Sequence, residues 1–148
     1  MVEFINVNKN PKLRKTGDCS TRALCNILHI TYEKALEEQC ETSKKYCYGL
    51  TDKQTIDKIM EKYGWKKQKQ PRKLNNNKYK VYEMDDVLSS DEMEEGALVL
   101  IANHWTVIRD YYIEDIWDCG RKSVGNYWIK KGNTNEVSLS NISSYFIK

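Results

Sequence analysis

The chain has 148 residues, of which 40% are hydrophobic and 30% charged, and its formal net charge is +3. This composition predicts one globular domain over residues 1–148 and excludes disordered and fibrous classes. No apolar run approaches the ~18 residues of a membrane span, and the N-terminus lacks signal-peptide features. Five cysteines, an odd number without a CxxC pair, predict a reduced chain in the cytoplasm.

The first half of the chain is predicted to be mainly helical, after a short strand at 4–7. A helix is expected from Cys19 to about Leu28, because apolar residues there recur at helical spacing. Thr31 is the expected N-cap of a second helix that ends near Cys40. The sequence Thr51-Asp52-Lys53-Gln54 has the form of a capping box and predicts a third helix, which Gly64 ends.

The second half is predicted to be mainly β-structure. A turn is expected at 75–77, a short strand at Val81-Tyr82 and a helical turn at Met84 to Leu88. Alternating or continuous apolar runs, separated by turns such as Asp110-Tyr111 and 131–133, then predict strands at 97–102, 104–109, 112–117, 126–130 and 137–139. The expected class is α+β, with N-terminal helices packed on a C-terminal antiparallel sheet.

Cys19 is the candidate nucleophile. It falls on the first turn of the first predicted helix, directly after Gly17 and Asp18. The positive end of the helix dipole and the unpaired backbone N–H groups there favour the reactive thiolate. A thiol at this position therefore indicates nucleophilic chemistry, provided that a base lies within reach.

His104 is the candidate base, and Asp118 is the candidate acid that orients it. The other histidine, His29, lies ten residues along the Cys19 helix, or ~15 Å away, and cannot reach the thiol. His104 begins a predicted strand, and Asp118 ends the strand that follows it in a hairpin, so the two side chains are expected to meet. The order Cys, His, Asp fits a thiol triad.

The stretch from Asn10-Pro11 through a basic spacer to Gly17-Asp18-Cys19-x-x-Arg22-Ala23 resembles the opening of small papain-like cysteine peptidase proteins of phages and prophages. The segments Ile116-Trp117-Asp118-Cys119 and Gly125-Asn126-Tyr127-Trp128 resemble the end of the same proteins, and the resemblance covers roughly residues 8–130. It implies a papain-like fold, with Cys19 as nucleophile, His104 as base and Asp118 as orienting acid.

Three further residues are expected to support this site. Papain-like enzymes usually have a Gln before the nucleophile as an oxyanion donor, but this chain has none there. The Asn10 amide is the candidate substitute, together with the Cys19 backbone N–H, and an ordinary turn at Asn10 is the alternative. Arg22 is expected to pair with Asp18, either to keep the thiolate charged or to clamp the loop.

The favoured function is a cysteine peptidase or isopeptidase that needs no cofactor or metal. Its partner would be a protein or peptide substrate and, if the chain is phage-encoded, a host or defence factor in the host cytoplasm. One alternative is a catalytically silent binder on the same fold that sequesters a host protein. The sequence does not define the substrate or the oligomeric state.

Two other classes remain as alternatives. Residues 62–80 carry eight basic side chains and no acid, and their aromatic residues Tyr63, Trp65 and Tyr79 suit base stacking, but no nucleic-acid-binding signature accompanies them. An acidic stretch at 83–95 follows. A structural zinc site is the other alternative, although no paired-ligand motif joins its candidate residues Cys25, His29, Cys40, Cys47 and Cys119.

Overall fold

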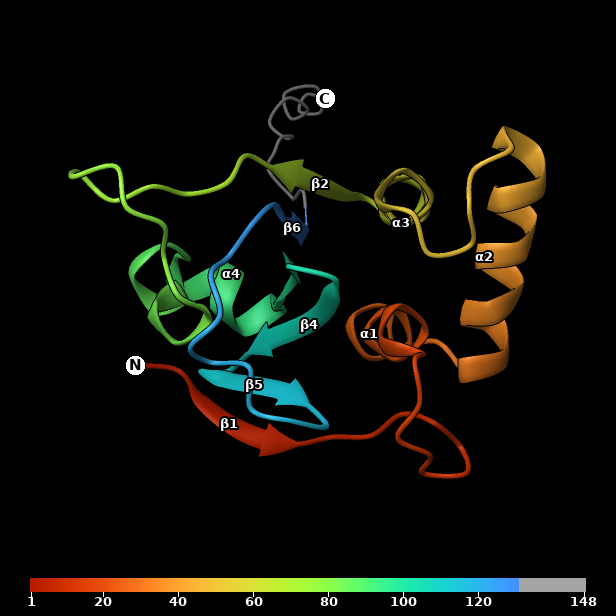
Figure 1. Ribbon diagram of the computed structural model, residues 1–148, viewed down its shortest axis with the longest axis horizontal. Coiled ribbons are helices and arrows are strands. Elements are labelled where there is room, and N and C mark those ends of the chain that lie inside the picture. Colours follow the sequence, from red (N-terminus) through yellow and green to blue (C-terminus); the bar gives the residue numbers. More distant parts are fainter. Residues whose placement is uncertain (131–148) are drawn as a thin grey trace, which may run out of the picture.

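The computed structural model describes residues 1–130, in which helices pack against one sheet (Figure 1). The elements in chain order are β1 (Glu3–Asn6), α1 (Cys19–Leu28), α2 (Tyr32–Tyr46), α3 (Lys53–Lys62), β2 (Trp65–Gln68), the 3₁₀ helix η1 (Val81–Asp86), α4 (Ser90–Glu95), β3 (Ala97–Ile101), β4 (His104–Arg109), β5 (Tyr112–Asp115) and β6 (Tyr127–Lys130). The predicted α+β class is confirmed. The turn and strand predicted at 131–133 and 137–139 lie outside the described residues.

The six strands form one mixed sheet in the order β1-β5-β4-β3-β6-β2. β1 pairs with β5 in parallel, and the other neighbouring strands are antiparallel. The predicted antiparallel pairing is thus confirmed among the C-terminal strands β3–β6, but the sheet as a whole is mixed and both of its edge strands come from the N-terminal half. Pairings such as Glu3 with Tyr112 join residues far apart in the chain, and local sequence patterns do not encode them.

The helices differ from the predictions mainly at their ends. α1 spans the predicted residues, and the Thr31 hydroxyl caps α2 by accepting the Lys34 N–H at 3.0 Å. α2 continues past Cys40 to Tyr46. The sequence prediction ended this helix too early because its last turns are polar and show no apolar periodicity. The capping box predicted at Thr51 is wrong: Asp52 is the N-cap of α3, and its carboxylate accepts the Gly49 N–H at 2.8 Å.

Residues 81–95 form two short helices. Val81-Tyr82 begins η1 and is not the predicted strand, whereas the helical turn predicted from Met84 falls partly within η1. α4 follows, and Ser89 and Glu92 form a capping box at its start, which the sequence analysis overlooked. These helices cover the face of the sheet opposite α1.

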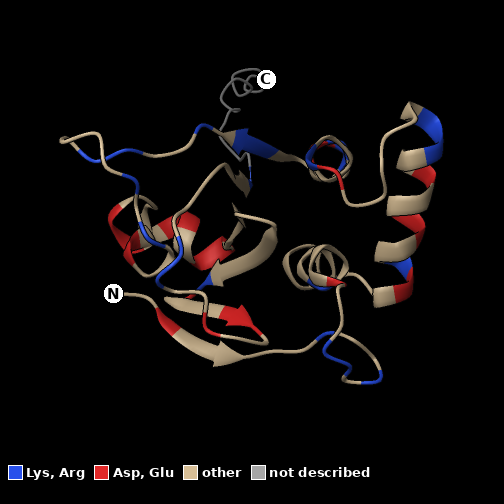
Figure 2. Ribbon diagram, in the orientation of Figure 1, with Lys and Arg blue, Asp and Glu red and all other residues tan. Residues whose placement is uncertain are grey.

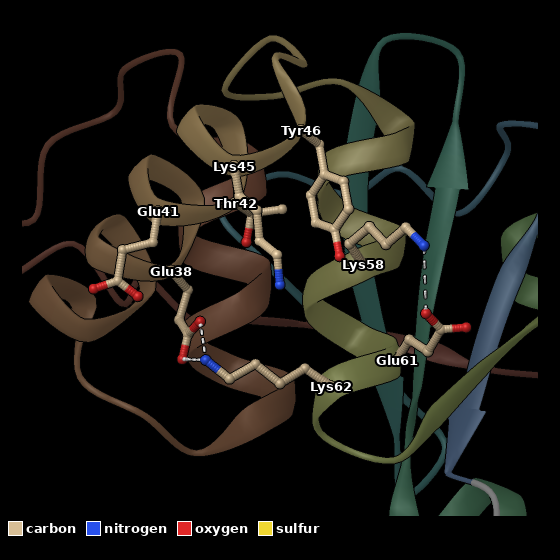
Figure 3. Close-up of a pocket in the computed structure, with 8 residues that line it drawn as sticks. All are labelled: Glu38, Glu41, Thr42, Lys45, Tyr46, Lys58, Glu61 and Lys62. Atoms are coloured by element: carbon tan, nitrogen blue, oxygen red, sulfur yellow. Dashed lines mark hydrogen bonds and ion pairs between the residues drawn. The ribbon is translucent and has the colours of Figure 1, made fainter.

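α2 and α3 pack beside each other and enclose a hollow of about 440 Å³ (Figure 3). The Glu38 carboxylate is buried there and accepts from Lys62 Nζ at 2.8 Å and from the Tyr63 hydroxyl at 2.6 Å. Lys58 lies 3.8 Å from Glu61 on the same wall. The cations and carboxylates of this hollow therefore largely neutralise one another.

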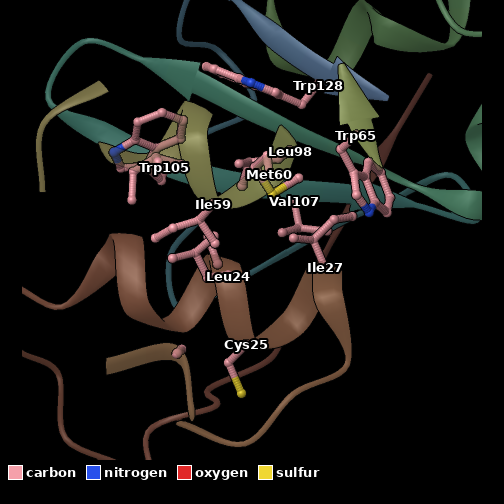
Figure 4. Packing of buried hydrophobic residues seen from close by; sticks show 13 residues of the cluster. Leu24, Cys25, Ile27, Ile59, Met60, Trp65, Leu98, Trp105, Val107 and Trp128 are labelled. Carbon is pink, nitrogen blue, oxygen red and sulfur yellow. The ribbon is translucent and has the colours of Figure 1, made fainter. Parts of the chain in front are cut away.

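Hydrophobic side chains pack on both faces of the sheet. On the face toward α1 and α3, Leu98 and Val107 pack with Leu24, Ile27 and Ile59 (Figure 4). On the opposite face, a second cluster joins the alternate strand residues to η1 and α4, and its members include Ala97, Val99, Ile101, Ile108, Ile113, Met84 and Met93. Since side chains alternate along a strand, β3 contributes to both clusters and holds the two layers together.

Charge is segregated along the described chain (Figure 2). Basic side chains follow β2 and the loop after it, and acidic side chains gather on η1 and α4. Lys73 joins the two segments through an ion pair with Glu83 at 2.8 Å. Among the described helices, none combines the length and the apolar character needed to cross a bilayer.

Candidate active site

The start of α1 fixes the position of Cys19. The Asp18 carbonyl accepts the Arg22 N–H at 2.9 Å, which closes the first helical turn around the cysteine. Cys19 is partly exposed and packs at the edge of the core between α1 and the sheet. The thiol thus lies at the positive end of the helix dipole, as the sequence predicts.

Two tight hairpins bring the other site residues to Cys19. β3 turns into β4 through Ala102 and Asn103, so that Ile101 pairs with His104 at the end of the sheet. β4 turns into β5 through Asp110 and Tyr111, whose φ angles of 52° and 68° give the positive-φ pair of a type I′ turn. This turn fixes the register in which Arg109 pairs with Tyr112.

Asp115, and not Asp118, is the acid that contacts His104. Its Oδ2 atom lies 2.6 Å from His104 Nε2, and its side chain is buried. Asp118 is exposed and accepts the Gly120 N–H at 2.9 Å, in a turn. The prediction of Asp118 as the partner of His104 is therefore wrong in this structure.

The reason for this difference is strand length and alternation. β5 ends at Asp115, where the carboxylate Oδ1 accepts the Ile116 N–H at 2.7 Å, and the chain bends two residues before the predicted strand end. Val107 pairs with Glu114, so the next pair in the hairpin is Thr106 with Asp115. Thr106 and His104 are two residues apart on β4, so Asp115 lies on the same face of the sheet as His104. The two-residue turn was recognisable in the sequence, and counting from it would have favoured Asp115.

The electrostatics of the His104–Asp115 pair favour an imidazolium and a carboxylate. Burial alone lowers the pKa of His104, but hydrogen bonds to Asp115 and Cys19 outweigh it and raise the pKa to about 9. Burial raises the pKa of Asp115, whereas the bond to His104 brings it below its ordinary value. The Trp117 ring lies 4.8 Å from the His104 ring and covers one side of the pair.

Cys19 differs from the two buried thiols, Cys25 and Cys119. Burial raises its pKa, but the hydrogen bond to the His104 ring and the Trp105 backbone N–H more than compensate, so the pKa lies below the ordinary thiol value. Burial raises the pKa of Cys25, and it raises that of Cys119 to about 12. Cys19 is thus the thiol whose surroundings favour the anion.

A buried polar network connects the α1 loop to the His104–Asp115 pair. Arg22 Nε donates to Asp18 Oδ1 at 2.7 Å, and Arg22 Nη1 lies 3.4 Å from Asp115 Oδ1. The structure therefore contains the Asp18–Arg22 pair that the sequence predicts. The contact of Arg22 with Asp115 had no signal in the sequence, because it joins residues 93 positions apart.

Asn10 belongs to this network and does not line the cleft beside Cys19. Its Nδ2 donates to Asp18 Oδ2 at 2.8 Å, and its Oδ1 accepts the Lys12 N–H at 2.9 Å. The Tyr32 hydroxyl, which the sequence analysis did not single out, donates to the same Asp18 oxygen at 2.7 Å. Asn10 therefore supports the loop, and the Cys19 backbone N–H remains the candidate oxyanion donor.

An open cleft of about 640 Å³ lies beside Cys19 and His104. The β3–β4 hairpin forms an apolar wall of it, and the starts of α1 and α3 form the remainder. Trp105 lines the cleft but does not fill it, because its ring packs on Trp128 with the ring centroids 5.3 Å apart. The partly exposed thiol thus opens onto a space of peptide size, and the buried His104 ring borders that space.

In residues 1–130, one group of three metal-ligating side chains lies close together. His104, Asp115 and Cys119 have ligand atoms within 4.8 Å of one another. Two of these residues are already hydrogen-bonded to each other, and Cys119 is a thiol with a raised pKa, whereas a zinc ligand is a thiolate. Cys25, a candidate for the zinc alternative, instead donates to the Ile30 carbonyl at 2.8 Å.

The basic segment at 62–80 forms an edge strand and an exposed loop. Two of the three aromatic residues expected to stack on bases have other roles, because Trp65 is buried and the Tyr63 hydroxyl donates to Glu38. Tyr79 is half-buried, with Lys73 over its ring at 5.5 Å. The geometry thus gives the nucleic-acid alternative little support.

No protein-family model matches this chain, and no curated protein or solved structure is significantly similar to it. The chemistry of the site therefore rests on its own geometry.

Proposed function

We propose that the protein is a papain-like thiol hydrolase that cleaves an amide bond in a peptide or isopeptide. The observation that carries the proposal is the grouping of three side chains at the edge of an open cleft: Cys19 and His104 lie near enough to shift each other's pKa, and the His104 ring contacts the Asp115 carboxylate. A nucleophile, a base and an orienting acid in this order are the requirements of thiol catalysis.

In the acylation step, the Cys19 thiolate attacks the carbonyl carbon and forms a C–S bond. The carbonyl oxygen takes the displaced electron pair and accepts the Cys19 backbone N–H. The C–N bond then breaks, and the leaving amine takes a proton from the His104 imidazolium. Since Nε2 is bonded to Asp115, Nδ1 is the nitrogen that exchanges this proton.

In the deacylation step, water attacks the thioester carbon and gives a proton to His104 Nδ1. The C–S bond breaks, the carboxylic acid leaves, and the thiolate–imidazolium pair is restored. Asp115 remains a carboxylate throughout, and it holds the ring with Nδ1 toward Cys19.

The silent-binder alternative would be favoured by a thiol far from His104 or by a cleft filled by Trp105. Among the described residues, Cys19 and His104 line the same open cleft and each shifts the pKa of the other, which supports the enzyme instead. A host protein remains the expected substrate if the chain is phage-encoded.

The test uses a peptide library and the neutral electrophile iodoacetamide. Cys19→Ala should lower amide cleavage by at least about 10³-fold and abolish the fast-reacting thiol, since removal of a nucleophile removes the whole catalytic unit. Cys40→Ala, at an exposed cysteine, is the matched control and should change neither the amide cleavage nor the fast reaction with iodoacetamide. Equal cleavage by wild type and Cys19→Ala would refute the proposal.

A further inference from the structure

The walls of the cleft beside Cys19 differ in character. One wall is apolar and comes from the β3–β4 hairpin, with Leu100, Ala102 and Trp105. Facing the same space, Thr51 and Lys53 come from the start of α3. A ligand that fills the cleft therefore meets a hydrocarbon surface and an ammonium group together.

Lys53 is the one permanently charged side chain among the described residues that line this cleft, and none of them is acidic. Its ammonium group donates to the Asn126 Oδ1 atom at 2.9 Å, which is a neutral acceptor. No carboxylate within residues 1–130 forms an ion pair with it, and the neighbouring Asp52 carboxylate accepts from Gly49 instead.

The other lysines near α3 are different. Lys62 is paired with Glu38, and Lys58 lies close to Glu61, so their charges are offset locally. Within residues 1–130, the positive charge of Lys53 has no such carboxylate partner, whereas the His104 imidazolium is paired with Asp115. A carboxylate is the group that complements this field.

We propose that the cleft selects amide substrates that carry a carboxylate together with an apolar side chain, the carboxylate pairing with Lys53 and the apolar group lying on the β3–β4 hairpin. The inference rests on the proposed function and adds a substrate class to it. The carboxylate can be an Asp or Glu side chain or the C-terminus of a peptide, because the chemistry that Lys53 recognises is the same.

The first experiment compares alkylation of Cys19 by iodoacetate and iodoacetamide, which differ in one carboxylate. Lys53→Glu should lower the ratio of the two rate constants by about two- to fivefold, since an exposed ion pair is worth up to about a fivefold change. An acidic residue suits the first turn of a helix, so the variant should fold. Lys58→Glu makes the same charge change on α3 outside the cleft, and should leave the ratio unchanged.

The second experiment identifies the source of the carboxylate. Matched peptides carry Glu or Gln near the scissile bond, and each is made with a free or an amidated C-terminus. If Lys53 recognises a side chain, the Glu peptide should be cleaved faster than the Gln peptide; if it recognises a C-terminus, the free peptide should be cleaved faster than the amidated one. Lys53→Glu should reverse whichever preference is found.

The outcomes separate the two proposals. If Lys53→Glu changes neither the alkylation ratio nor any peptide preference while Cys19 stays reactive, the carboxylate inference is wrong and the hydrolase proposal stands. If Cys19 is no more reactive than the exposed cysteines and no peptide is cleaved, both proposals fail.

Discussion

Asp115 and Asp118 are three residues apart, yet their environments differ completely. Asp115 is buried against His104 and Arg22, whereas Asp118 is exposed and holds a turn. A buried carboxylate that bonds the imidazole can stabilise its charged form, and an exposed one in a turn cannot. The choice between these two residues therefore decides which acid orients the base.

Replacing each acid by its amide tests this choice. Asp115→Asn should lower amide hydrolysis by about 10²-fold to 10⁴-fold, because an amide does not hold the imidazole in its productive tautomer. It should also lower the His104 pKa from about 9 toward its ordinary value, measured by NMR titration. Asp118→Asn is the matched control and should change neither the rate of hydrolysis nor the His104 pKa. If Asp118→Asn lowered both and Asp115→Asn lowered neither, Asp118 would be the orienting acid.

The pH dependence of the site follows from the two shifted groups. Hydrolysis needs the thiolate, so activity should rise as Cys19 ionises below the ordinary thiol pKa. It also needs the imidazolium proton, so activity should fall as the pH rises through about 9, where His104 deprotonates. Alkylation by iodoacetamide needs only the thiolate and should lack the falling limb; a falling limb in both profiles would contradict these roles.

At the scale of elements, α1 and β5 meet through one buried guanidinium. Arg22 on α1 contacts Asp18 before the helix and Asp115 at the end of β5, and its side chain is 7% exposed. The same residue therefore holds the loop before Cys19 and the carboxylate that contacts His104 in one arrangement. Without the guanidinium, Asp18 would lose its counter-ion and Asp115 would keep only His104 as a cationic partner.

Arg22→Met should lower the free energy of unfolding by about 3–5 kcal/mol, because breaking a buried ion pair strands its partners. Arg22→Lys keeps the charge but cannot contact Asp18 and Asp115 together in the same way, so it should lower the free energy of unfolding by less than Arg22→Met does. Lys58→Met, at the exposed pair with Glu61 on α3, should cost no more than about 0.5 kcal/mol. Urea titration followed by tryptophan fluorescence measures all three, and an Arg22→Met midpoint equal to that of Lys58→Met would exclude the structural role.

At the scale of the molecule, the parts predicted well are those that local patterns encode. The stripe of Ala23, Leu24, Ile27 and Leu28 defined α1, and hence Cys19 at its start. The alternation from His104 to Arg109 defined β4 and placed the base at a strand start. These two features were enough to single out Cys19 and His104 as the candidate nucleophile and base.

The parts that the sequence analysis missed depend on distant contacts. β1 and β2 take their edge positions from partners far along the chain, and Lys53 reaches the cleft only because α3 packs beside α2 and β2. Arg22 and Asp115 meet for the same reason. Asp115 itself was within reach of local reasoning, because the Asp110-Tyr111 turn sets its strand face.

The most direct test of the central claim is to find which of the five thiols carries the acyl group during turnover. The chain is mixed with an activated acyl ester, quenched at acid pH within the first turnover, and mapped by peptide mass spectrometry. The account predicts a thioester on Cys19, lost in Cys19→Ala and strongly reduced in His104→Ala. An acyl group found instead on the exposed Cys40 or Cys47, or on no cysteine while the ester is consumed, would contradict it.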